Sequence, residues 1–171
     1  MRVRVPAWAW LLGGGALLLV ARRSSSSSGY SYGGPDWRGI SRDPRLLVPT
    51  FAAKLELVFQ RMRALGFDPC LYEGYRTPAR AAQLEEKGTG IAKSLHSYGG
   101  AVDITSCSKG WSDPAFFQAL GKVVESLGLT WGGRFSRGDM PHVQAVPADE
   151  PTQNAFRATV DRDAFVRRYI A

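Results

Sequence analysis

The chain contains only two histidines, and each lies in a glycine-rich segment close to an aspartate. His96 belongs to "SLHSYGGAVDI", in which two glycines separate it from Asp103, seven positions later. His142 belongs to "WGGRFSRGDMPHVQ", with Asp139 three positions before it and Pro141 directly before it. Because glycine adopts the backbone conformations of tight turns, the Gly-Gly pair predicts that Asp103 folds back beside His96. Any fold for this chain has to bring these two short segments together.

Two imidazoles and one carboxylate form a donor set that binds zinc and leaves a fourth tetrahedral position open. We therefore predict that His96, Asp103 and His142 are the protein ligands of a Zn²⁺ ion. Asp139 is too close in sequence to His142 for both to bind comfortably unless the backbone bends. We assign Asp139 as the general base that takes a proton from the attacking water and delivers it to a leaving amine. The alternative is that these groups are caps, turn residues or satisfied polar side chains of the core.

The pattern of apolar residues predicts an α+β fold, a small mainly antiparallel sheet with flanking helices. Helices are expected at residues 49–65, 78–87 and 114–127, the last two after the start signals Thr77-Pro78 and Asp113-Pro114. Short strands are expected at residues 70–76, 101–105, 129–131 and 142–146. Residues 147–171 form an extension with apolar side chains that we expect to pack on the domain as one or two helices, namely Phe156, Val160, Phe165 and Tyr169.

The first apolar run, residues 5–21, contains no charged residue and has two arginines on each side. As a helix it would be about 26 Å long, slightly shorter than the bilayer core of about 30 Å. We therefore expect residues 1–23 to form a signal anchor, a transmembrane segment or an uncleaved signal peptide; a cleavable signal and a buried core helix fit less well. Residues 24–34 are rich in serine and glycine and predict a flexible linker. The catalytic domain would then occupy residues 35–146.

The net charge does not indicate a nucleic-acid partner. The chain of 171 residues has a formal charge of +7, but four of its arginines flank the apolar run, so the remainder carries only +3. A charge of that size is a mildly basic surface. The length and the 44% hydrophobic content suit one folded domain, which we expect to be a monomer.

Both histidine segments resemble the signatures of a known family, the M15-type zinc peptidases. "SLHSYGGAVDI" is similar to the pattern S-x-H-x-x-G-x-A-x-D, and "WGGRFSRGDMPHVQ" looks like the closing motif of the endopeptidase branch. The family comprises bacterial D-alanyl-D-alanine carboxypeptidases and dipeptidases, and the L-alanyl-D-glutamate endopeptidases of bacteria and phage endolysins. The resemblance extends over about residues 37–146. It implies zinc on the two histidines and Asp103, with Asp139 as the base.

Two further roles follow from the resemblance. "YEGYRTPARAAQL" is similar to the family segment whose arginine, here Arg76, points into the cleft and stabilises charge on the scissile carbonyl. Ser94 is similar to a family serine that holds a substrate group. The alternatives are a surface arginine at a strand end and an ordinary loop hydroxyl.

The resemblance implies that the substrate is a stem peptide of peptidoglycan. Asp139 stands where carboxypeptidase relatives usually have glutamate, which favours an L-alanyl-D-glutamate endopeptidase. Val143 stands where the endopeptidase branch commonly has an aromatic residue, which is a departure from that branch. The alternatives are a D-alanyl-D-alanine carboxypeptidase and a non-catalytic wall-binding module. Because the wall lies outside the cell membrane, we expect an extracytoplasmic catalytic domain, either membrane-anchored or exported.

The chain has two cysteines, Cys70 and Cys107, at the ends of two of the predicted strands. If these strands are antiparallel neighbours, a disulfide between the cysteines is geometrically allowed, and it fits an exported protein. Two independent buried thiols are the alternative.

Overall fold

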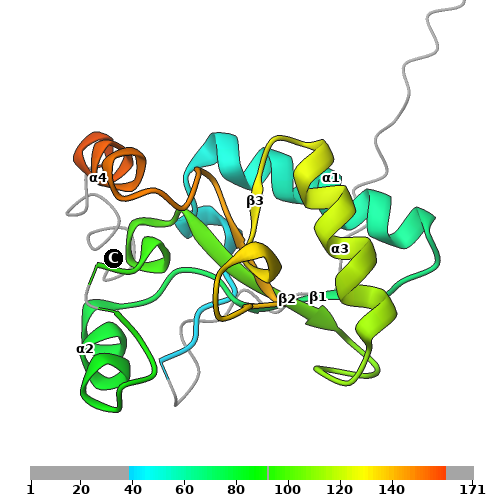
Figure 1. Cartoon of the computed structure of the whole chain (residues 1–171), viewed down its shortest axis with the longest axis horizontal. Coiled ribbons are helices and arrows are strands. Elements are labelled where there is room, and N and C mark those ends of the chain that lie inside the picture. Colours follow the sequence, from blue (N-terminus) through cyan, green and yellow to red (C-terminus); the bar gives the residue numbers. More distant parts are fainter. Residues whose placement is uncertain (1–38, 92, 161–171) are drawn as a thin grey trace, which may run out of the picture. The chain divides into compact units, whose positions relative to one another are not determined.

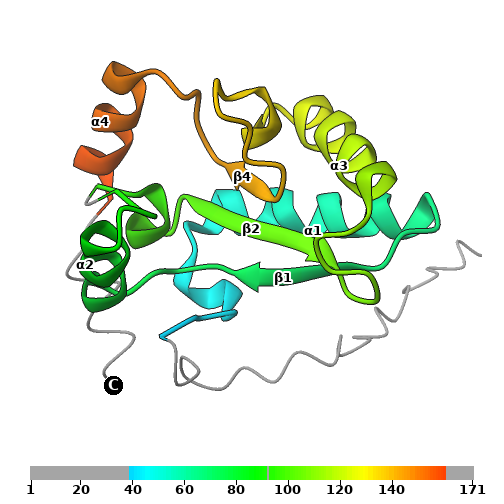
Figure 2. The ribbon, with the colours of Figure 1, turned by 60° about the horizontal axis from the view of Figure 1, so that its bottom comes forward.

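The computed structural model describes residues 39–91 and 93–160. Its centre is a four-stranded antiparallel sheet in which the strand order is β1-β2-β4-β3 (Figures 1 and 2). The strands are β1 (Pro69–Glu73), β2 (Ala101–Ser106), β3 (Thr130–Trp131) and β4 (His142–Gln144). The predicted α+β class with a small antiparallel sheet is confirmed for this part of the chain.

The helices begin where the sequence signals place them. They are α1 (Pro49–Ala64), α2 (Pro78–Glu86), α3 (Pro114–Ser126) and α4 (Glu150–Thr159), with short 3-10 helices η2 (Pro44–Leu46), η3 (Leu95–Tyr98) and η4 (Gly132–Arg134). The Thr77 hydroxyl accepts the Arg80 backbone N–H at 3.2 Å, and the Asp113 carboxylate accepts that of Phe116 at 3.2 Å. Both bonds satisfy N–H groups that have no partner within the helix, which stabilises each start.

One face of the sheet carries the core. Val102 and Ile104 of β2 and Val143 of β4 are fully buried, and α1 and α3 pack against each other and against the strands (Figure 2). Trp131 lies so close to α3 that a Cβ atom on Gly121 would collide with its ring. Because side chains alternate along a strand, residues 101, 103 and 105 of β2 point to the opposite face.

Two predicted strands end earlier than expected. The strand predicted at residues 70–76 ends at Glu73 because the chain leaves the sheet there, where the Gly74 N–H binds the carbonyl of Ser41 at 2.7 Å. Arg76 instead forms an isolated bridge with Ile40. The strand predicted at residues 142–146 ends at Gln144.

Cys70 and Cys107 are joined by a disulfide, with their Cα atoms 5.0 Å apart. Cys70 is paired with Thr105 across β1 and β2, so Cys107 lies just beyond its register partner. The bond links the two strands at the end where β2 finishes.

Several expectations concern residues outside the described ranges. These are the segment 1–23, the linker 24–34 and the last residues of the tail, including Phe165 and Tyr169. Within residues 39–91 and 93–160, no helix has the length and apolar content needed to cross a bilayer.

Candidate metal centre

Strand register places three acidic or imidazole side chains in a row across the sheet. Asp103 of β2 is paired with His142 of β4 on one side and with Glu73 of β1 on the other. Directly opposite residues of antiparallel strands point to the same face. Asp103, His142 and Glu73 therefore share the face opposite the buried Val102 and Ile104. A register irregularity between Leu71 and Glu73 brings Glu73 into this row.

His96 reaches the same face from η3, just before β2. Gly99 ends η3 with a φ of 64°, a left-handed conformation that glycine adopts without strain. The reversal that follows returns the chain into β2, so Asp103 comes back beside the His96 ring. The predicted Gly-Gly turn is confirmed, and only 2% of His96 is exposed.

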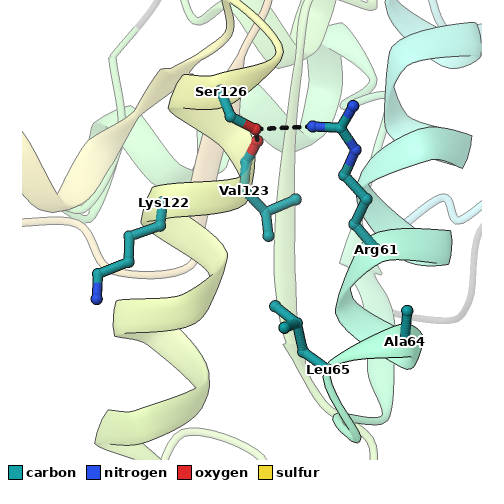
Figure 3. Close-up of a pocket in the computed structure, with 6 residues that line it drawn as sticks. All are labelled: Arg61, Ala64, Leu65, Lys122, Val123 and Ser126. Carbon is teal, nitrogen blue, oxygen red and sulfur yellow. Dashed lines mark hydrogen bonds between the residues drawn. The ribbon is translucent and has the colours of Figure 1, made fainter.

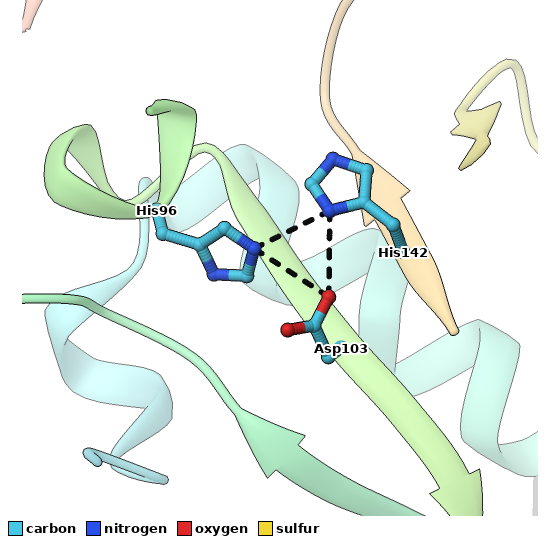
Figure 4. Close-up of side chains that lie close together, drawn as sticks. All are labelled: His96, Asp103 and His142. Carbon is cyan, nitrogen blue, oxygen red and sulfur yellow. Dashed lines mark hydrogen bonds and ion pairs between the residues drawn. The ribbon is translucent and has the colours of Figure 1, made fainter. Parts of the chain in front are cut away.

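The three donor atoms form a nearly equilateral triangle (Figure 4). The His96 Nε2 atom lies 3.5 Å from Asp103 Oδ1 and 3.3 Å from His142 Nδ1, and His142 Nδ1 lies 3.4 Å from Asp103 Oδ1. A tetrahedral ion with bonds of about 2.0–2.1 Å holds its ligand atoms about 3.3–3.4 Å apart. The spacing and the donor chemistry both fit zinc.

Hydrogen bonds on the far side of each ring direct the free lone pairs toward this point. His96 Nδ1 lies 2.8 Å from the Gly74 carbonyl oxygen, which only accepts, so Nδ1 carries the proton and Nε2 is free. His142 Nε2 donates to the side-chain oxygen of Gln144 at 3.1 Å, which leaves Nδ1 free. The Gln144 amide is oriented by its own bond to the Val146 carbonyl at 2.7 Å. Such partners fix the tautomer and orientation of metal-binding imidazoles.

The electrostatics of the three groups are coupled. Burial by itself raises the pKa of Asp103, but the neighbouring His96 and His142 outweigh it and hold that pKa far below its usual range. Burial by itself lowers the pKa of His142. Its hydrogen bond to Asp103 and the Asp103 charge outweigh burial, so the pKa of His142 is raised overall. Asp103 is therefore a carboxylate at neutral pH, the form in which it could hold a metal ion.

Asp139 stands on the loop between η4 and β4, next to the site. Its N–H binds the Gly132 carbonyl at 2.8 Å, and its carbonyl accepts the His142 N–H at 3.1 Å. A Cβ on Gly132 would collide with the Asp139 carbonyl and the His142 side chain, so this turn needs glycine. Trp131 closes the loop by donating its indole N–H to the Met140 carbonyl at 2.7 Å.

The Asp139 residue is solvent-exposed, yet the pKa of its carboxyl group is affected by the charged groups of the metal centre. Burial raises the pKa of Asp139, and the Asp103 charge raises it further, against the opposing effects of His142, His96 and Arg76. We attribute this combination to a carboxyl group that faces the site from an otherwise accessible loop. A raised pKa brings a carboxylate nearer to the range useful for proton transfer.

Arg76 is buried between two carboxylates. Its Nε and Nη2 atoms each lie 3.0 Å from an oxygen of Glu73, and Nη2 also lies 4.0 Å from Asp103 Oδ2. Its Nη1 atom donates to the Ser94 hydroxyl at 3.4 Å. Arg80 contacts the same Glu73 carboxylate at 3.4 Å. Arg76 is thus an inward-facing group beside the centre, and the alternative of a surface arginine is wrong.

Glu73, Gln144 and the Gly74 carbonyl were not anticipated from the sequence. Glu73 has only 3% of its surface exposed, and a carboxylate three positions before an arginine at a strand end was the available signal. Gln144 stands two positions after His142 on the same strand, so strand alternation could have placed it on the same face. The Gly74 carbonyl had no sequence signal.

A separate hollow of about 350 Å³ lies between α1 and α3 (Figure 3). Arg61 spans it by donating to the Ser126 hydroxyl at 2.9 Å. It is lined by residues that take no part in the metal centre, namely Arg61, Ala64, Leu65, Lys122, Val123 and Ser126.

Residues 87–145 match the profile of a peptidase family, Peptidase_M15_4, described as D-alanyl-D-alanine carboxypeptidase. The matched segment contains all three donor residues and Asp139, but neither Arg76 nor α4. No curated protein has a significant sequence match to the chain.

Solved structures are similar to this chain. The crystal structure of the Serratia marcescens L-Ala D-Glu endopeptidase ChiX is similar with a TM-score of 0.52 and 22% identity, over 60% of this chain and 83% of that one. A Zn(II) complex of the vancomycin-resistance D,D-pentapeptidase VanY has a TM-score of 0.47 and 16% identity, over 70% and 83%. The LD-carboxypeptidase LdcB has a TM-score of 0.43 and 18% identity, over 71% and 68%.

The family profile covers both histidine segments, and the geometry of the donor atoms agrees with the zinc site that the family implies. Residues 87–145, the part of the chain that holds the three donor residues and Asp139, are similar to the M15 family of peptidases.

Proposed function

We propose that this protein hydrolyses the stem peptides of peptidoglycan, and that the bond it cuts is the one between L-alanine and D-glutamate. The observation that carries the proposal is the triangle of donor atoms from His96, Asp103 and His142, with edges of 3.3–3.5 Å and the Asp139 loop beside it. A wall-binding module without catalytic activity would have no need for this donor set together with a carboxyl group whose pKa is raised.

Zinc, when bound, supplies a Lewis acid that polarises the peptide carbonyl and makes water nucleophilic near neutral pH. His96, His142 and Asp103 would hold it. In our proposal the Asp139 carboxylate takes the proton from the attacking water and passes it to the departing amine nitrogen. Its position on an accessible loop lets it meet the substrate from the solvent side.

Arg76 and Ser94 would act on the substrate. The Glu73 carboxylate holds two nitrogens of the guanidinium, so its direction is set before substrate arrives. We propose that Nη1 of Arg76 stabilises the negative charge on the scissile carbonyl oxygen, and that the Ser94 hydroxyl binds a polar group nearby. Both side chains are buried, so reorganisation on binding is small.

A second candidate is a D-alanyl-D-alanine carboxypeptidase. It is favoured by the description of the family profile that matches residues 87–145. The endopeptidase is preferred because an aspartate, not a glutamate, stands at position 139.

Mass spectrometry of defined muropeptides incubated with zinc-loaded protein separates these activities. An endopeptidase cuts after L-alanine and frees the rest of the stem peptide from the glycan-linked part. A carboxypeptidase releases only D-alanine and leaves the stem attached. Zinc-loaded protein that cleaves no muropeptide would contradict both and revive the wall-binding alternative.

We also propose that residues 1–23 tether the protein to the cytoplasmic membrane or direct its export, with the catalytic domain outside. The disulfide between Cys70 and Cys107 supports an oxidising compartment. Protease added to intact spheroplasts should digest the catalytic domain. Protection of the domain until the membrane is broken would contradict this location.

A further inference from the structure

Helix α4 lies outside the matched family segment, and none of its residues is buried. A surface helix of this kind could be dispensable. However, residues 146–160, which we call the strap, contact the segments that carry both histidines and Arg76. Figure 1 shows α4, in orange, beside the green turn that precedes β2.

The strap begins at Val146, which binds Gln144, the hydrogen-bond partner of the His142 ring. The Val146 carbonyl accepts the Gln144 side-chain N–H at 2.7 Å, and the oxygen of the same amide accepts the ring Nε2–H of His142 at 3.1 Å. The Ala145 N–H, just before the strap, binds the Gly100 carbonyl at 2.9 Å. The position of Val146, the first residue of the strap, therefore affects the orientation of the His142 ring through Gln144.

The strap then reaches the segment that carries His96. The Phe156 ring lies directly on Gly100, where even a Cβ atom would collide with it. The Arg157 Nε atom donates to the Lys93 carbonyl at 2.9 Å. Asn154 and Gln153 hold the other two guanidinium nitrogens at 2.9 Å each, which aims the side chain at Lys93.

These two contacts lie on either side of η3 in the sequence. Lys93 directly precedes Ser94, and Gly100 directly follows the Gly99 that ends η3. The six residues between them are the four-residue 3-10 helix η3, which includes His96, and its caps Ser94 and Gly99. An element this short has few internal hydrogen bonds, so its position depends on what packs against it.

The end of the strap makes a third contact. Val160 packs against a small buried cluster formed by Leu46 and Tyr75. Tyr75 is the neighbour of Arg76 along the chain. The strap thus contacts Gln144 of β4, the η3 segment and the segment next to Arg76.

We propose that the strap is a positioning element that keeps the His96 and His142 rings at the spacing that zinc requires, with Phe156 and Arg157 as its positioning residues. This inference rests on the metal centre assigned above, but not on the choice of substrate. Without these contacts the η3 turn moves away from β4 more often, and the ion escapes through the opened triangle.

The rate of zinc transfer from the loaded, full-length protein to a chromophoric chelator tests this directly. Phe156→Ala and Arg157→Ala should each release zinc about tenfold faster than the wild type, in the range found for residues that orient metal ligands. Arg157→Lys keeps one donor and should restore part of the loss. Glu150→Gln, on an exposed position of the same helix, is the matched control and should release zinc at the wild-type rate.

Gly100→Ala provides a second route, because its methyl group displaces the Phe156 ring without shortening any side chain of the strap. It should also release zinc faster. In the double variant with Phe156→Ala the collision is gone, so zinc should leave no faster than from Phe156→Ala alone. Thermal unfolding of each variant shows whether the fold persists.

Equal release rates in the wild type, Phe156→Ala and Arg157→Ala would overturn the proposal, as would an equal acceleration by Glu150→Gln. The measurement needs no substrate, so it is separate from the proposed activity. Faster release from the variants together with a wild type that cleaves no muropeptide would support the strap and refute the peptidoglycan substrate. Active wild type with unchanged release rates in the variants would refute the strap alone.

Discussion

The Nδ1 atom of His96 lies 2.8 Å from the backbone carbonyl of Gly74, a residue 22 positions earlier in the chain. The carbonyl cannot donate, so this contact assigns the proton to Nδ1 and leaves Nε2 to face Asp103 and His142. Gly74 is also the point where β1 ends, because its own N–H binds the Ser41 carbonyl. The end of one strand therefore determines the tautomer of the His96 imidazole on another segment.

The first prediction concerns the ligands and their support. Asp103→Asn should abolish stoichiometric zinc binding, because the site loses its only anionic donor. Gln144→Leu should keep the stoichiometry and weaken affinity about 10- to 100-fold, since His142 Nε2 loses its acceptor. Competition with a chelator of known affinity measures both effects. Full zinc affinity in Asp103→Asn would refute the assigned centre.

The second prediction separates the base from the ligands. Asp139→Ala should retain one zinc per chain while the turnover number falls about 10²- to 10⁴-fold, the range expected on removal of a general base. Metal analysis and muropeptide turnover on the same preparation check it. Ser136→Ala, on an exposed position of the same loop, should behave as the wild type. An active Asp139→Ala protein would rule out this role.

The third prediction is that Glu73 acts through Arg76. Arg76→Lys cannot form two parallel bonds to the Glu73 carboxylate and should lower turnover about 10²-fold. Glu73→Gln should lower it by a smaller factor, since the guanidinium is then held less firmly. The double variant should be no worse than Arg76→Lys. Independent, multiplicative losses in this double-mutant cycle would show that Glu73 has a different role.

The fourth prediction concerns the disulfide. Cys70 and Cys107 are 37 positions apart, and closing a loop of this length stabilises the folded state by about 4 kcal/mol in the chain-entropy treatment. The Cys70→Ser/Cys107→Ser protein should therefore have a markedly lower free energy of unfolding in a denaturant titration. Reduced wild-type protein should show the same loss. A difference below about 1 kcal/mol would indicate that the cross-link adds little to stability.

The fifth prediction is a pH effect on stability away from the centre. Hydrogen bonds from the Ser106 hydroxyl, the Ser108 side chain and the Ser108 N–H lower the pKa of Asp68 from its ordinary 3.8 to about 2. Since the folded-state pKa is the lower one, this stabilisation is fully present above 3.8 and is lost as the pH falls toward 2. Near neutral pH, Asp68→Asn should have a lower free energy of unfolding than the wild type. In acid the difference between the two proteins should become smaller. Denaturant titrations of both proteins at several pH values test this, and a deficit that stays constant would contradict it.

Local sequence was enough for much of the fold and for the donor set. Thr77 and Asp113 started helices as expected, and the glycines after His96 produced the turn, because caps and turns depend on neighbouring residues. The choice of His96, Asp103 and His142 also required no structure, since the residue types alone define a zinc donor set.

Only the tertiary structure decided how these groups are oriented. The pairing of Asp103 with His142 and with Glu73 depends on strand register, which no short stretch of sequence encodes. Two hydrogen bonds form only when the chain packs into its tertiary structure. One joins Arg76 to Glu73, and the other joins Arg157 to Lys93, 64 positions away. Residue types set which chemistry is available, and long-range packing sets the distances at which that chemistry operates.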